Sequence, residues 1–178
     1  MLALVAIWAF AEATVWFIVA DVPIMAVALK SGMRRGLVAA LVATGFAAAG
    51  GIATWIWANA SPEDVTALFE RLPGIDADLI VEAAQEWDSE GLAGMTLGAF
   101  TGTPYKLYAL AAVDRGSNPA MFFVASLVAR LPRFMLIAVV AGWIGPRLRA
   151  AIGARAMWAL FALGWAGFYA WYFAAMPA

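Results

Sequence analysis

Apolar residues gather along the chain in five long stretches that are separated by shorter polar segments. The stretches cover residues 1–29, 36–60, 92–113, 119–145 and 156–176. A straight helix that crosses a bilayer needs about 20 predominantly apolar residues. The second, fourth and fifth stretches meet this requirement without interruption, so they predict three full transmembrane helices.

The first and third stretches are interrupted in the middle. Glu12 and Asp21 lie within the first stretch, while Gly102, Pro104 and Lys106 lie within the third. Glycine and proline disturb helical hydrogen bonding, and irregular backbone at membrane depth is tolerated only when it is buried in protein or lines a wet cavity. We therefore expect two re-entrant helical hairpins, with two ordinary kinked spans as the alternative.

One long polar segment, residues 61–90, separates the two halves of the chain. It holds nine acidic residues and a single basic residue, Arg71. Ser61 followed by Pro62 is typical of a helix start, and apolar residues then recur three and four positions apart. The pattern predicts two short amphipathic helices on the membrane surface or over the protein, with a solvated linker as the alternative.

The basic residues cluster in two other places, and they set the expected topology. The positive-inside rule assigns both clusters to the cytoplasm, so the acidic segment faces outward. Each half is then a hairpin followed by a span, in opposite orientations, which is the pattern of an inverted repeat. The basic residues concerned are Lys30, Arg34 and Arg35, and Arg147, Arg149 and Arg155.

Composition supports this interpretation. Hydrophobic residues make up 65% of the 178 residues and charged residues 13%, whereas soluble domains are about 45–50% apolar. We expect one all-α polytopic membrane domain covering residues 1–178. The chain has no cysteine and no histidine, which excludes disulfides, the usual zinc ligands and Cys or His catalysis. We expect no metal site, no cofactor, no nucleic-acid partner and no enzymatic activity.

Five ionisable residues fall inside the apolar stretches: Glu12, Asp21, Lys106, Arg130 and Arg133. Each costs about 2.5–3.5 kcal/mol at the centre of a membrane helix, so five unpaired charges would cost on the order of 12–17 kcal/mol. That sum rivals the whole stability of a typical domain, about 5–15 kcal/mol. These residues must therefore be paired, hydrated or close to an interface.

The two arginines are three residues apart, so they share one face of a helix. Pro132 between them should loosen the helical hydrogen bonding and open a kink. The two acids of the first hairpin are expected to neutralise them, and Lys106 of the second hairpin adds a third cation. Because the guanidinium fork suits oxyanions, the pattern predicts a midplane cavity that binds phosphate. A structural ion-pair network is the alternative.

Two smaller features complete the expectations. Gly45, Gly50 and Gly51 in the second stretch predict close helix packing. Asp114 and Arg115 are adjacent in a polar turn and are expected to form an ion pair there.

Two segments of the second half carry recognisable motifs, FTGTPYKLYALAA at 100–112 and FFVASLVARLPRF at 122–134. They resemble the DedA family, also called the VTT or SNARE-associated family, and in particular its YqaA-like branch. The resemblance lies in the Pro-aromatic-Lys sequence that includes Lys106 and in the Ala-Arg-x-x-Arg-Phe sequence that follows. Glu12 and Asp21 resemble the acid pair of the family's first hairpin, although Val19-Ala20 stand where the family often has prolines.

The resemblance implies a bacterial cytoplasmic (inner) membrane protein that moves lipids between leaflets, as a flippase or scramblase. The implied substrate is undecaprenyl phosphate or a phospholipid, with the arginines facing the phosphate and the acids taking up protons. Whether transport is proton-coupled, and whether the chain forms a homo-oligomer, stays open. The alternatives are a small-solute or ion transporter and a membrane scaffold that transports nothing.

Overall fold

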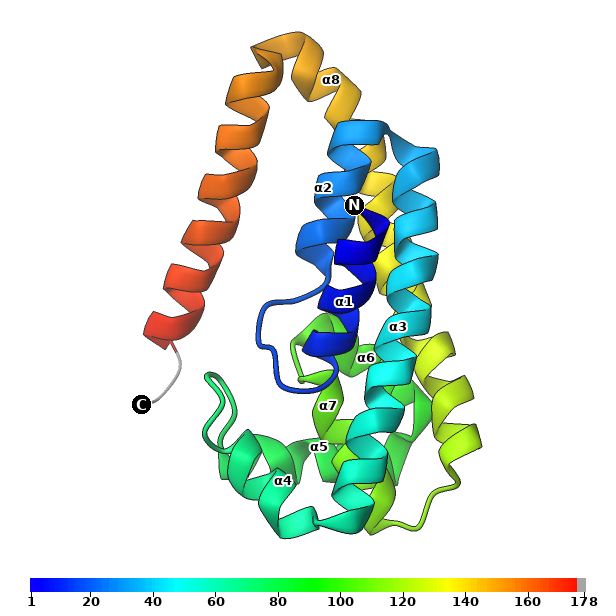
Figure 1. The fold of residues 1–178 in the computed structure, drawn as a ribbon. Coiled ribbons are helices and arrows are strands. Elements are labelled where there is room, and N and C mark those ends of the chain that lie inside the picture. Colours follow the sequence, from blue (N-terminus) through cyan, green and yellow to red (C-terminus); the bar gives the residue numbers. More distant parts are fainter. Residues whose placement is uncertain (176–178) are drawn as a thin grey trace.

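A computed structural model describes residues 1–175, and this part of the chain is all-helical, with eight helices and no strand (Figure 1). Most of the chain forms an upright bundle, and α4 and α5 close its lower end. The helices are α1 (Leu2–Glu12), α2 (Asp21–Ser31), α3 (Met33–Ala60), α4 (Pro62–Phe69), α5 (Ala77–Glu90), α6 (Leu92–Thr101), α7 (Tyr105–Asp114) and α8 (Pro119–Ala175).

Two of these helices, α3 and α8, are long and apolar enough to cross a membrane. They also pack against each other more extensively than any other pair of helices in the described chain. The side of α3 that faces the bundle carries mainly alanine and glycine, which allow close helix approach, while Leu41, Phe46 and Ile56 are exposed on its outside. A helix that is apolar all round is typical of a core or a membrane span.

The helix breaks expected in the first and third apolar stretches are confirmed. Residues 13–20 separate α1 from α2, and 102–104 separate α6 from α7. Gly102 ends α6 with a φ of 112°, a conformation that side chains with a Cβ rarely adopt. Pro104 stands immediately before α7, in an extended conformation. The φ angle that the proline ring fixes is compatible with the start of a helix. Both breaks lie near the middle of the bundle (Figure 1).

The last long helix does not end where the sequence indicates. The fourth stretch is expected to stop at residue 145, but α8 stays helical through Pro132 and Pro146 and is interrupted only at Gly153 (φ 80°, ψ 163°). The backbone keeps helical φ and ψ angles at Pro132, and the non-helical conformation within α8 is at Gly153. Proline removes one helical hydrogen bond, whereas this glycine conformation reverses the chain. Residues 154–175, called the C-terminal arm below, run back along the bundle (Figure 1). Position 176, the expected end of the last span, lies outside the described residues.

The polar segment forms the two short helices expected, α4 and α5, so the linker alternative is wrong. Ser61 stands at the N-cap of α4, but its side chain makes no capping hydrogen bond. Asp76 caps α5, accepting a hydrogen bond from the Leu79 backbone N–H at 2.8 Å. Val65 and Phe69 of α4 are buried in a cluster that includes residues of α7. The segment therefore covers the end of the bundle rather than standing apart from it.

The ion pair expected between neighbours Asp114 and Arg115 is wrong. Arg115 instead donates from Nε to Asp88 Oδ1 at 2.5 Å and pairs through Nη2 with the other carboxylate oxygen. This hydrogen bonding raises the pKa of the Arg115 guanidinium above its ordinary value. The adjacent Asp114 ends α7, and the chain turn places Arg115 beside α5 instead. The pair links the acidic segment to the α7–α8 connection.

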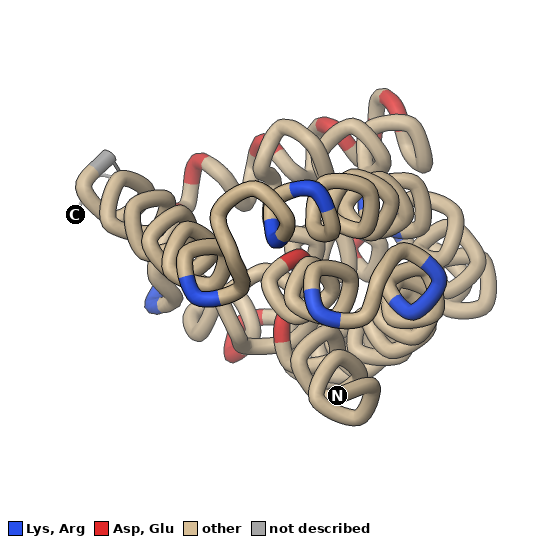
Figure 2. Tube along the Cα trace, turned by 90° about the horizontal axis from the view of Figure 1, so that it is seen from above, with Lys and Arg blue, Asp and Glu red and all other residues tan. Residues whose placement is uncertain are grey.

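Basic residues gather at the opposite end of the bundle from the acidic segment. Lys30 lies in the last turn of α2, Arg34 and Arg35 begin α3, and the other arginine cluster flanks Gly153. Figure 2, which views this end, shows the blue positions on the turn between α2 and α3 and around the bend of α8. The charge asymmetry expected from the sequence is thus an end-to-end asymmetry of the fold.

Two of the three glycines expected to allow close packing do so. A Cβ on Gly50 would meet the Phe10 backbone of α1, and a Cβ on Gly51 would overlap the phenol of Tyr105. A Cβ on Gly45, by contrast, would find no atom within 4 Å. Close approach of α3 to α1 and to α7 therefore depends on Gly50 and Gly51.

The glycine contacts predict opposite effects for two alanine substitutions in the same helix. Gly51→Ala should destabilise the protein by about 1–3 kcal/mol, because the new methyl group overlaps the buried Tyr105 ring. Gly45→Ala should be neutral or stabilising by up to about 1 kcal/mol, because alanine favours the helix and meets nothing. Equilibrium unfolding in mixed detergent micelles measures both. Equal stability of the two variants would contradict the proposed packing.

Candidate functional site

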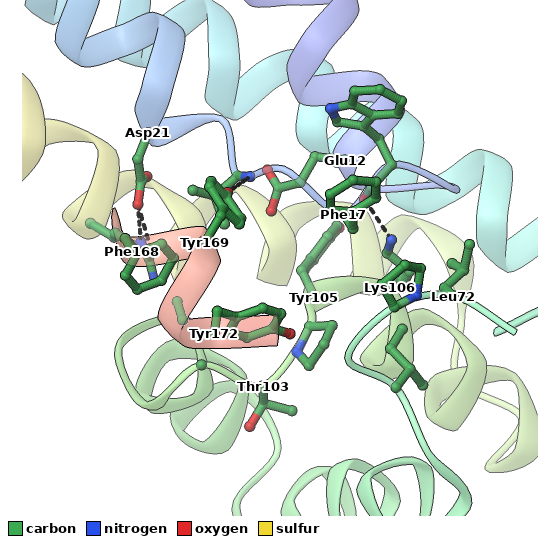
Figure 3. A pocket seen from close by; sticks show the side chains of 18 of the residues that line it. Glu12, Phe17, Asp21, Leu72, Thr103, Tyr105, Lys106, Phe168, Tyr169 and Tyr172 are labelled. Carbon is green, nitrogen blue, oxygen red and sulfur yellow. Dashed lines mark hydrogen bonds and ion pairs between the residues drawn. The ribbon is translucent and has the colours of Figure 1, made fainter. Parts of the chain in front are cut away.

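The two breaks in the helices meet at the centre of the bundle. Lys106, in the first turn of α7, donates a hydrogen bond from Nζ to the Trp16 carbonyl oxygen in the α1–α2 break, at 2.7 Å. Figure 3 shows the labelled side chains of Glu12 from α1 and of Tyr105 and Lys106 from α7 around one space. The contact joins residues 90 positions apart. Both hairpin tips therefore contribute to one site.

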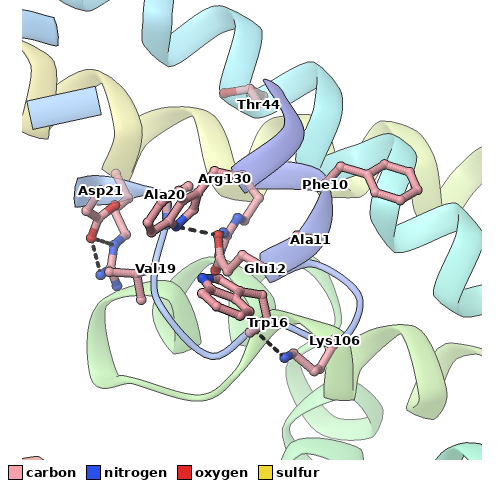
Figure 4. Close-up of polar contacts among 12 residues, drawn as sticks. Phe10, Ala11, Glu12, Trp16, Val19, Ala20, Asp21, Thr44, Lys106 and Arg130 are labelled. Atoms are coloured by element: carbon pink, nitrogen blue, oxygen red, sulfur yellow. Dashed lines mark hydrogen bonds and ion pairs between the residues drawn. The ribbon is translucent and has the colours of Figure 1, made fainter. Parts of the chain in front are cut away.

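Glu12 and Arg130 form a buried ion pair. Arg130 Nη2 donates to both carboxylate oxygens of Glu12, at 2.7 and 2.6 Å, and the Arg130 and Glu12 side chains are 6% and 10% exposed. The second carboxylate oxygen also accepts from the Ala20 backbone N–H at 3.3 Å (Figure 4). Glu12 ends α1, so it joins the tip of the first hairpin to α8.

Aromatic rings enclose the Arg130 guanidinium. Its central carbon lies 4.9 Å from the Tyr105 ring centroid and 4.7 Å from that of Phe134, within the range of cation–π attraction. Tyr105 is itself fixed by a hydrogen bond that it donates to Ser126 Oγ at 2.5 Å. Arg130 Nε has no partner among the described residues. This guanidinium therefore retains one donor that the protein does not use.

Asp21 and Arg133 form the second pair, one helical turn away. Arg133 Nε donates to Asp21 Oδ2 at 2.9 Å, and Nη2 donates to the same oxygen. The Asp21 side chain is 3% exposed but that of Arg133 is 24% exposed. The other carboxylate oxygen of Asp21 is buried without a hydrogen bond in the described structure. Arg130 and Arg133 thus share a face of α8, and the expected pairing with Glu12 and Asp21 is confirmed.

Lys106 differs from the arginines because no carboxylate of the described chain pairs with it. It is 3% exposed and its side chain donates to the Trp16 carbonyl. The three cations and two carboxylates together carry one net positive charge. An anion that enters therefore meets a lysine whose charge is not already neutralised.

These five charged residues line one cavity, together with Gly102 and Pro104 of the second break. The space encloses about 820 Å³, counting the part open to the surroundings. Pro132, which the sequence indicates as part of the site, does not line it.

The C-terminal arm contributes three aromatic residues that sequence reasoning missed. Phe168, Tyr169 and Tyr172 line the cavity, and Figure 3 shows them on the side opposite Lys106. The Tyr169 hydroxyl accepts a hydrogen bond from the Val19 backbone N–H at 2.9 Å. The sequence carried no signal for these roles, because they lie in an unbroken apolar stretch rich in aromatic residues. Tyr105, by contrast, stands inside the Pro-aromatic-Lys sequence, which was a signal that could have identified it.

Among residues 1–175, no group of three or more acidic side chains lies close enough together to hold a metal ion. Guanidinium and ammonium groups can donate charge-assisted hydrogen bonds to an anion, and carboxylate groups can take up protons.

Comparison of the chain with protein-family models, with curated proteins and with solved structures gave no match.

The buried pair predicts a strong coupling between Glu12 and Arg130. Glu12→Gln should lower the free energy of unfolding by about 3–5 kcal/mol, because it leaves the Arg130 charge buried without its partner. Adding Arg130→Met to that variant should restore part of the loss. Equilibrium unfolding in mixed micelles of the single and double variants measures the coupling.

The exposed ion pair between Asp88 and Arg115 supplies the control for this unfolding experiment. Asp88→Asn removes the partner of Arg115, whose side chain is 56% exposed, and should leave the free energy of unfolding unchanged because water solvates both groups. Additive effects of Glu12→Gln and Arg130→Met would contradict a direct buried interaction.

Proposed function

We propose that this chain is a multi-pass protein of the bacterial cytoplasmic membrane that moves a phosphate-bearing lipid between leaflets. The observation that carries the proposal is the cavity at the centre of the bundle, where three cations and two carboxylates face one space. The resemblance of residues 100–134 to the DedA family agrees with this function. Phospholipids and polyprenyl phosphates such as undecaprenyl phosphate share the phosphate chemistry that such a site would recognise.

Helix lengths support two re-entrant hairpins. At 1.5 Å per residue, α1, α2, α6 and α7 each measure about 15–17 Å, half of a hydrocarbon core of about 30 Å. The C-terminal arm measures about 33 Å by the same rule and is long enough to cross. Half-length helices whose breaks meet in the middle of the bundle fit hairpins that enter from opposite sides and return.

The arrangement also fits an inverted repeat. In Figure 1, α1 and α2 join at a break that points down toward the centre, and α6 and α7 join at a break that points up. Each hairpin is followed by a long helix, α3 or α8. In transporters with inverted repeats, the substrate site lies near the midplane where the broken helices meet. The basic end, which includes Lys30 and Arg34, would face the cytoplasm.

The proposed mechanism is an exchange of partners at the arginines. With both acids ionised, Glu12 and Asp21 hold the guanidinium groups and the cluster has one net positive charge. Protonation of both carboxylates would raise that net charge to three and free the arginine donors for a phosphate. Lys106 would be the first contact, since no carboxylate of the described chain neutralises it. This exchange would couple lipid binding to proton uptake.

One observation favours a second candidate, a membrane scaffold. Both ion pairs bridge the first hairpin to α8, across 118 and 112 residues, so they also stabilise the fold. A scaffold would need the pairs but no open cavity and no free cation. A small-solute or ion transporter would use the same charges without moving a lipid.

Lipid movement can be tested with a variant of Lys106. In liposomes that contain fluorescent phosphatidylglycerol, wild type should move the lipid between leaflets. Lys106→Gln should slow this movement about tenfold or more, because the loss of one charge-assisted hydrogen bond to the phosphate changes the rate by about that factor. The substitution leaves no buried carboxylate without an ion-pair partner, so the variant should fold. Accessibility of the fluorophore to a membrane-impermeant quencher measures the movement, with and without a pH gradient.

Arg115→Gln is the matched control, because it removes a cation outside the cavity. It should transport like wild type. If wild type moves neither phosphatidylglycerol nor a polyprenyl phosphate, the proposal is wrong. Uptake of a soluble anion that depends on Lys106 would then indicate the solute transporter, and no flux of any kind would indicate the scaffold.

A further inference from the structure

A second cavity lies beside the first, between α2 and the C-terminal arm. Met25 of α2 and Leu160, Phe161, Gly164 and Trp165 of the arm line it. It encloses about 710 Å³, part of it open to the surroundings. We call this space the lateral groove.

The lateral groove and the central cavity share part of their lining. Val19, Arg133 and Phe168 line both spaces. Arg133 is the single charged residue that lines the groove in the described part of the chain, and its side chain keeps 24% of its surface exposed although it pairs with Asp21. The groove is therefore apolar along its length and cationic where it reaches the cavity.

The C-terminal arm contacts the α1–α2 break beside the central cavity, but it leaves open space nearer to its bend at Gly153. The Val19 backbone N–H donates to Tyr169 at 2.9 Å, and the ring centroids of Phe17 and Phe173 lie 5.6 Å apart. Farther toward the bend, a Cβ on Gly164 would find no atom within 4 Å. A flexible apolar chain fits this geometry, because the lining is uncharged except for Arg133, which also lines the central cavity.

We propose that the lateral groove holds the hydrocarbon chain of one lipid whose phosphate lies at Arg133. The inference rests on the lipid class of the proposed function, but it concerns binding and does not require translocation. Charge complementarity selects this occupant: an anionic headgroup would meet Arg133 and Lys106, and the apolar wall would cover the tail. A helix from a second copy would place no anion at Arg133.

Photocrosslinking tests the groove directly. A photoreactive Phe161→p-benzoylphenylalanine variant, purified in dodecyl maltoside, would be irradiated with dioleoyl phosphatidate or with dioleoylglycerol at the same mole fraction. The two lipids share their tails and differ in the phosphate. We expect about tenfold more adduct with phosphatidate, because one charge-assisted hydrogen bond at Arg133 is worth about that factor in affinity. Mass spectrometry of the intact protein measures the adduct.

Two controls separate the groove from the general lipid surface. Leu163→p-benzoylphenylalanine places the same probe on an arm residue that is 69% exposed and lines neither space, so both lipids should react equally there. In the Phe161 probe variant, Gly164→Leu should fill the groove and abolish the preference for phosphatidate. Gly167→Leu, on the same arm and also without neighbours, should preserve it.

Equal adduct yields at position 161 for the two lipids would overturn the inference, and so would adducts between two protein chains. A phosphatidate preference at position 161 without any lipid movement in liposomes would support the groove and refute the transporter. Lipid movement without that preference would refute the groove and leave the transporter standing.

Discussion

The buried ion pair between Glu12 and Arg130 is the interaction on which the rest of the structure depends. A guanidinium that is nearly inaccessible to solvent is costly unless a close counter-charge accompanies it. The two residues are 118 positions apart, so the pair forms only if the tip of the first hairpin reaches the N-terminal part of α8. Asp21 and Arg133 repeat the constraint one turn away. Together the pairs determine where the first hairpin ends and which face of α8 it meets.

Close packing makes that approach geometrically possible. Gly50 lets the end of α1 lie against α3, and Gly51 admits the Tyr105 ring. Tyr105 in turn lies against Arg130 and is held by Ser126. Gly51, Tyr105 and Arg130 therefore lie against one another in turn, and they connect the packing of α3 with the charged cluster.

The same interactions that stabilise the fold would also prepare the site for the anion that we propose as its ligand. Burial strengthens the attraction between each arginine and its acid, but it strengthens the attraction for a competing phosphate as well. The cluster keeps a net positive charge because Lys106 contacts a carbonyl oxygen instead of a carboxylate. The unused Nε of Arg130 and the exposed part of Arg133 leave donors available. The structural ion-pair network and the proposed binding site are thus one set of residues.

Local physical chemistry determined much of this protein from its sequence. Apolar length predicted the long helices, Gly102 and Pro104 predicted a break because they cannot continue regular helical hydrogen bonding, and the cost of buried charge predicted that Glu12 and Asp21 pair with the arginines. Only the tertiary structure decided that α8 passes Pro146 and bends at Gly153, that Arg115 pairs with Asp88, and that Tyr169 meets Val19. These outcomes depend on which surfaces pack together across the chain, and periodicity along the sequence carries no information about that choice.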